Sequence, residues 1–121
     1  MERTTWKASE RRMAKALGGE RVPVSGRGRG SVPDIEHPRF AIEHKAGRVM
    51  SARMLEAVDQ AEAAAQHSGK LPLVTIEQSS GPGRPNRRFV LLPLDPFILL
   101  AGVGAGTEIE ERELNGGGIV A

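Results

Sequence analysis

The chain of 121 residues has no cysteine and few aromatic residues. The missing cysteines exclude disulfide bonds and thiolate metal sites, and they are compatible with a reducing compartment. Aromatic residues make up 3% of the sequence, so the core must consist mainly of aliphatic side chains. We expect a modest core in one domain, which dimerisation would help to stabilise.

Long apolar runs are also missing. The segment MERTTWKASERR at the start lacks the apolar part of a secretory signal, and the longest apolar stretch, residues 97–103, is too short to cross a bilayer. These absences predict a soluble, cytoplasmic protein without a membrane partner.

The net charge is only +2, but the charge is uneven along the chain. Residues 1–45 carry ten Lys or Arg against six acids, an excess of +4, whereas residues 96–121 carry one Arg against four Glu, an excess of −3. A basic first part suits a polyanion such as nucleic acid, although an excess of this size is common in proteins of many functions.

Hydrophobic periodicity and turn residues predict alternating helices and strands. The expected helices span residues 4–18 and 52–67, and the expected strands span residues 20–24, 32–37, 39–45, 71–78 and 87–94. This order predicts an α/β domain over residues 1–102, with a central mixed β-sheet of about five strands flanked by helices. Residues 103–121 are Gly-rich and acidic, and we expect a flexible tail there.

Glu10 occupies an unusual position on the first expected helix. It follows Trp6 by four residues and precedes Met13 by three, which places it within the apolar stripe. Desolvating a lone carboxylate costs several kcal/mol, so Glu10 must be paired, protonated or bound to a metal there. The alternative is a side chain at the margin of the stripe that reaches solvent.

Two acids and a lysine occupy the hairpin expected around His37-Pro38. Pro33-Asp34 opens one strand, and Glu43 and Lys45 lie on the next. Side chains alternate along a strand, so Glu43 and Lys45 share a face about 7 Å apart, and the hairpin can bring Asp34 beside them. The alternative is a solvated strand face with a weak ion pair.

Together, these motifs resemble those of the PD-(D/E)XK nuclease superfamily, which has a restriction-endonuclease-like core. The short chain, the Glu10-Arg11 pair and the Ser-Gly loop before Asp34 are similar to Holliday junction resolvases of the archaeal and phage kind. The resemblance covers roughly residues 6–100. The glycine-rich loop and the acidic tail depart from the family pattern, and they put the contacts with DNA arms in doubt.

The resemblance implies a Mg²⁺-dependent endonuclease, with Mn²⁺ as a substitute, that makes paired symmetric nicks in a four-way DNA junction. Its catalytic residues would be Glu10, Asp34, Glu43 and Lys45. Asp34, Glu43 and the backbone carbonyl of His44 would hold the metal, and Glu10 would complete the site directly or through water. Lys45 would orient the attacking water and stabilise the charge of the transition state. A homodimer would supply one site for each strand.

Basic residues outside this set are candidates for contacts with DNA. Arg11, Ser25, Arg27 and Arg29 suit phosphate contacts, and the alternative for the loop is a connector with solvated arginines. A second basic cluster, Arg84, Arg87 and Arg88, would contact a duplex arm or keep a sheet edge soluble. Two other functions stay open: a PD-(D/E)XK nuclease that acts on flaps or ends, and a nonenzymatic DNA-binding module.

Overall fold

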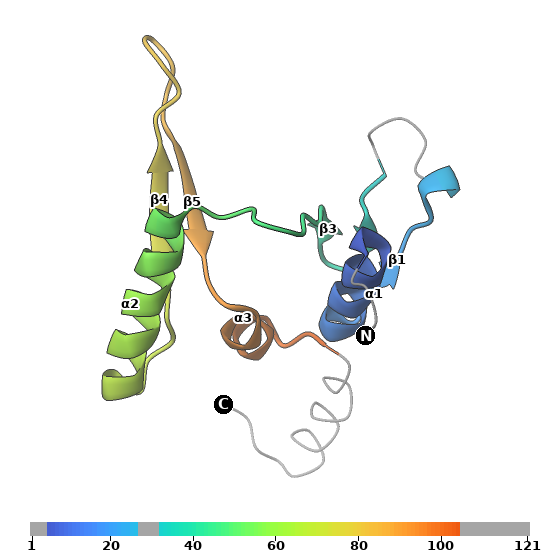
Figure 1. Ribbon diagram of the computed structural model, residues 1–121, viewed down its shortest axis with the longest axis horizontal. Coiled ribbons are helices and arrows are strands. Elements are labelled where there is room, and N and C mark those ends of the chain that lie inside the picture. Colours follow the sequence, from blue (N-terminus) through green and yellow to red (C-terminus); the bar gives the residue numbers. More distant parts are fainter. Residues whose placement is uncertain (1–4, 27–31, 105–121) are drawn as a thin grey trace. The chain divides into compact units, whose positions relative to one another are not determined.

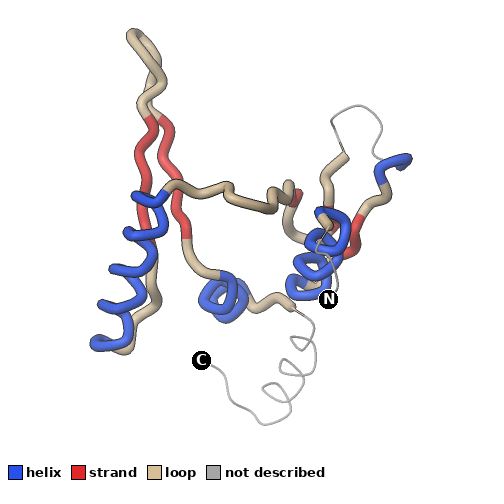
Figure 2. The backbone as a smooth tube through the Cα atoms, viewed as in Figure 1, coloured by secondary structure: helices blue, strands red, loops and turns tan. Residues whose placement is uncertain are grey.

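The computed structural model describes residues 5–26 and 32–104, which fall into two compact units. Of these residues, 5–26, 32–49 and 101–104 belong to the first unit, and residues 50–100 form the second. Helices and strands occur in both units, so the expected α/β class is confirmed (Figures 1 and 2).

The first unit begins with helix α1, Trp6–Leu17. Thr5 caps its start, because the side-chain oxygen accepts a hydrogen bond from the amide of Ala8 at 3.1 Å. Gly18 ends the helix with a φ of 76°, a left-handed conformation that glycine adopts without steric cost. One face of α1 is buried, and its buried residues are Glu10, Ala14 and Leu17.

A small antiparallel sheet packs against α1. It contains β1 (Glu20–Arg21), β2 (Ile35–Glu36) and β3 (Ala41–Ile42), in that order. Ile35 pairs with Arg21 on one side and with Ile42 on the other, and its side chain is fully buried. A short 3-10 helix, Val24–Gly26, follows β1.

The second unit contains helix α2, Ala52–Ser68, and a hairpin of β4, Val74–Gln78, and β5, Arg87–Leu91. Ser51 caps α2 by accepting a hydrogen bond from the amide of Met54 at 3.2 Å, and Gly69 ends the helix. Helix α3, Leu94–Ala101, follows β5 and was not predicted. Pro96 argued against a helix in the sequence, because proline usually breaks a helix. In α3 it lies in the first turn, where proline is tolerated.

The expected single mixed sheet is not confirmed. The strands of the described residues form one sheet of three and one of two, and every pair is antiparallel. Prolines shorten the first sheet, because proline has no amide hydrogen for the ladder. Pro23 follows β1 closely, and Pro33 and Pro38 flank β2.

The start of the expected tail belongs to the first unit. Val103 is only 6% exposed, and the backbone of Gly104 lies beside Gly18. The rest of that tail, residues 105–121, lies outside the described residues. In the described part of the chain, no helix has the length and apolar character needed to cross a membrane.

Candidate functional site

A buried ion pair joins α1 to β1. Arg21 donates from Nε to Oε1 of Glu10 over 2.7 Å, and Glu10 is only 3% exposed. The guanidinium carbon of Arg21 also lies 5.5 Å from the centre of the Trp6 ring. The position of Glu10 in the buried stripe is therefore confirmed, and the first of its three expected states, pairing with a cation, is the one observed.

The Asp34 carboxylate links the two motifs of the hairpin. The backbone amide of His44 donates to Oδ2 of Asp34 at 2.9 Å. The carbonyl of Asp34 accepts a hydrogen bond from the amide of Val22, also at 2.9 Å. Asp34 is thus held between the segment after β1 and the segment after β3, beside the E-x-K motif, as the hairpin argument predicted.

Ser9 connects α1 to the same place. Its hydroxyl lies 2.7 Å from Nε2 of His44, and both residues are partly buried. Ser9 precedes Glu10 in the chain, and His44 lies between Glu43 and Lys45, so this side-chain contact joins α1 to the segment that carries the E-x-K motif. A Ser-His-Asp catalytic triad is not formed here, because Asp34 binds the backbone amide of His44 and does not orient its imidazole.

The Glu43 and Lys45 side chains are exposed, whereas Ile42 and His44 are partly buried. The expected alternation therefore continues past Ile42, where β3 ends. Among residues 5–26 and 32–104, no group of three or more His, Cys, Asp or Glu side chains could hold a metal ion. Glu10 is buried against Arg21 whereas Glu43 is exposed, so the three candidate acids do not form a set of metal ligands here.

The candidate DNA contacts lie on exposed positions where the structure describes them. Arg11 is exposed on α1, and Ser25 is exposed in the 3-10 helix. Arg27 and Arg29 lie outside the described residues.

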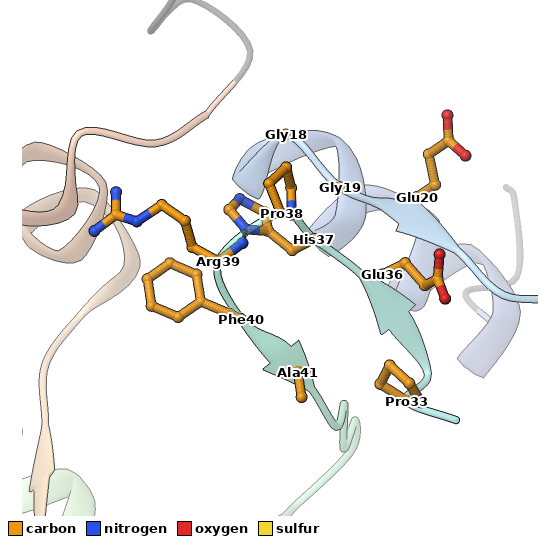
Figure 3. Close-up of a pocket in the computed structure, with 10 residues that line it drawn as sticks. All are labelled: Gly18, Gly19, Glu20, Pro33, Glu36, His37, Pro38, Arg39, Phe40 and Ala41. Atoms are coloured by element: carbon orange, nitrogen blue, oxygen red, sulfur yellow. Dashed lines mark hydrogen bonds between the residues drawn. The ribbon is translucent and has the colours of Figure 1, made fainter. Parts of the chain in front are cut away.

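A separate hollow of about 710 Å³ lies on the face of the three-stranded sheet away from α1 (Figure 3). Glu20 and Glu36 are opposite each other in the β1–β2 ladder, and both line the hollow. Both ring nitrogens of His37 are in use, because Nε2 donates to the carbonyl of Leu17 at 2.9 Å and Nδ1 accepts from the amide of Arg39 at 3.0 Å. This hollow contains none of the four predicted catalytic residues.

Sequence reasoning missed two residues at the site, Ser9 and Arg21. Ser9 directly precedes Glu10, and nothing in the sequence around it indicates a role. Arg21 lies in a two-residue strand between Glu20 and Val22, and a segment this short has no alternation pattern that would show which face Arg21 occupies. Neither family models, curated proteins nor solved structures give a match to this chain.

Proposed function

We propose that this protein is a metal-dependent DNA endonuclease that resolves four-way junctions, with a core of the restriction-endonuclease kind. The observation that carries the proposal is the hydrogen bond from the His44 amide to the Asp34 carboxylate at 2.9 Å. This bond brings the Pro-Asp motif to the Glu-x-Lys motif, although ten residues separate the two bonded partners. The Ser9 contact with the His44 side chain joins the helix that carries Glu10 to the same segment of the chain.

The oxygen donors at this place suit a hard cation. The carboxylates of Asp34 and Glu43 and the backbone carbonyl of His44 are the ligand types that Mg²⁺ and Mn²⁺ prefer. Bound there, the ion would lower the pKa of water and offset charge on the phosphate. Lys45, exposed beside them, would orient the attacking water and stabilise the developing negative charge.

Glu10 has a different part in this proposal from the one that the resemblance implies. Its carboxylate is bound to Arg21, so it would hold α1 on the sheet and keep Ser9 against His44. Glu10 is then a positioning residue, and direct metal contact would require it to leave Arg21. Removing one partner of a buried pair is costly, which favours the positioning role.

The same ion pair favours a second candidate function, a nonenzymatic DNA-binding module. If all the acids were structural, as Glu10 is, the chain would bind DNA through its basic residues without cutting it. The two candidates differ in one result, metal-dependent cleavage.

The test is a nicking assay on a synthetic four-way junction beside a linear duplex of the same sequence, with and without Mg²⁺. The native chain should nick the junction at paired symmetric positions as a homodimer, and only with the metal. Equal cutting of junction and duplex would leave a nuclease of another kind, such as one that acts on flaps or ends. Binding without cleavage under all metal conditions would favour the nonenzymatic module.

Two variants test the named residues. Asp34→Asn keeps an oxygen for the His44 amide but loses the charge, so it should fold normally and lose most of its cleavage. Lys45→Ala should also fold and cut at least about a hundredfold more slowly, the loss typical of one electrostatic group. The matched controls are Glu36→Gln and Lys15→Ala, which remove exposed charges of the same kind and should cut at the native rate.

A further inference from the structure

The β4–β5 hairpin ends in a loop that carries positive charge without acids. Gln78 and Arg87 form the last pair of the ladder, so residues 79–86 make up the loop. The loop contains Arg84 and no Asp or Glu, and residues 81–90 are all exposed. Figure 1 shows the loop extending beyond the N-terminal end of α2 within the second unit. It is therefore a protruding, basic ribbon.

The tip of this hairpin has a defined turn. The Arg84 amide donates to the carbonyl of Gly81 at 3.2 Å, and Gly83 between them has a φ of 74°. Proline at the second position and glycine with positive φ at the third are typical of a type II turn. Pro82 within the turn and Pro85 directly after Arg84 also restrict the backbone. Arg84 is thus presented with little backbone freedom, which reduces the entropy lost on binding.

The two arginines at the base of the loop have different surroundings. Arg88 is paired with Glu77, with 3.2 Å between Nε and Oε1. Arg87 points to the other face, as alternation along a strand requires, and its guanidinium carbon lies 4.9 Å from the centre of the Phe89 ring. Among the residues that the structure describes, no acid forms an ion pair with Arg84 or Arg87. These two charges are the ones free to meet a phosphate.

We propose that this hairpin is a second DNA-binding element, which holds a duplex arm through Arg84 and Arg87. A two-stranded antiparallel ribbon fits the major groove of B-DNA. Three residues of extended chain span at most about 10 Å, and a duplex carries roughly six phosphate charges over that length. Both arginines can therefore reach phosphates of one arm. The inference rests on the proposed function only in taking DNA as the ligand.

The test measures binding by the full chain without divalent cations. Fluorescence anisotropy with a labelled four-way junction and a labelled linear duplex would compare the native chain with Arg84→Ala/Arg87→Ala over a series of salt concentrations. Loss of two phosphate contacts should lower the slope of log K against log salt by about two. The affinity advantage of the native chain should then shrink about tenfold as salt rises from about 50 to about 200 mM.

The matched control is Lys70→Ala/Arg88→Ala, which removes two exposed charges from the same unit. It should bind closer to the native level, because Lys70 lies outside the loop and Arg88 is offset by Glu77. Arg84→Lys/Arg87→Lys should restore the native salt slope, since each lysine can still meet a phosphate. Equal weakening in the test and control variants, or no weakening in either, would overturn the proposal.

The outcome separates this inference from the proposed nuclease function. A native chain that binds DNA through the hairpin but never cuts it would leave the inference standing and remove the nuclease. A chain that nicks junctions with unchanged affinity after loss of both arginines would do the reverse. A native chain that binds neither the four-way junction nor the linear duplex would overturn both the inference and the proposed nuclease function.

Discussion

Arg21 donates from Nε to Oε1 of Glu10 over 2.7 Å, and the two side chains are only 14% and 4% exposed. Arg21 is also the ladder partner of Ile35, the fully buried residue of the small sheet. The pair therefore attaches α1 at the point where the sheet has its core. Both charges have left water, so each depends on the other to offset the cost of desolvation.

Replacing Arg21 with methionine should strongly destabilise the protein. The substitution keeps an apolar side chain of similar length but leaves the Glu10 carboxylate buried without a cation, which typically costs about 3–5 kcal/mol. Urea denaturation followed by circular dichroism would measure the loss in the free energy of unfolding. The double variant Glu10→Gln/Arg21→Met should regain part of that loss, because the buried charge is then gone.

The control for this prediction is Arg88→Ala. Arg88 also pairs with a glutamate, but the side chains of Arg88 and Glu77 are 85% and 55% exposed. Exposed pairs contribute about 0–1 kcal/mol, so the control should unfold close to the native denaturant concentration. If both arginine variants lost stability equally, the special role of the Glu10 pair would be refuted.

Ser9→Ala should reduce junction nicking more than it reduces stability. The hydroxyl contact with His44 is worth about 1 kcal/mol of folding free energy, yet it also fixes the segment between Glu43 and Lys45. We expect nicking to slow roughly tenfold through poorer positioning of these two side chains. Single-turnover nicking rates and unfolding curves on the same preparations would separate the two effects.

Two further variants define the Ser9 result. Ser9→Thr keeps the hydroxyl and should recover most of the nicking rate. Ser68→Ala removes a hydroxyl that bonds the Ala64 and Ala65 carbonyls of its own helix, so it should leave nicking unchanged. Equal rates for Ser9→Ala and the native chain would remove Ser9 from the site.

Gly19→Ala should disrupt the packing where the segment after α1 meets the three-stranded sheet. A Cβ at Gly19 would lie 2.5 Å from the carbonyl oxygen of Glu36 and 3.0 Å from Cγ2 of Ile35. Relief requires the β1–β2 pairing to shift, and overpacking of this kind costs about 1–3 kcal/mol. Amide hydrogen exchange at Ile35 should become faster, and the free energy of unfolding should fall.

Gly47→Ala provides the comparison for Gly19. Gly47 has a φ of 103°, but a Cβ there would meet nothing within 4 Å. Its substitution therefore adds backbone strain without a clash. If exchange at Ile35 changed equally in both variants, the close approach of Gly19 to β2 would not explain the effect.

Gly83→Ala should weaken DNA binding without removing a charge. The φ of 74° at Gly83 is unfavourable for alanine by about 1–2 kcal/mol, so the turn that presents Arg84 should open. We expect a roughly threefold to tenfold loss of affinity at low salt, with the salt slope nearly unchanged because all the arginines remain. A fall in the slope equal to that of Arg84→Ala/Arg87→Ala would contradict this reasoning.

The sequence by itself determined most of the local helices and strands, and it showed that Glu10 lies in an unusual position. Hydrophobic periodicity and turn residues predicted α1 and α2 closely, because both are local properties of the sequence. The same spacing placed Glu10 in the buried stripe, and the hairpin turn placed Asp34 beside the E-x-K motif. Helix α3 was not predicted, because the sequence does not show whether a proline lies in the first turn of a helix or breaks one.

Only the tertiary structure decided which partners those residues have. The cation that meets Glu10 comes from Arg21, eleven residues away, and the hydroxyl that meets His44 comes from Ser9, thirty-five residues away. The division of the strands into two antiparallel sheets was also invisible in the sequence. Side-chain alternation fixes which face a residue occupies, but strand pairing and burial depend on distant segments that periodicity does not specify.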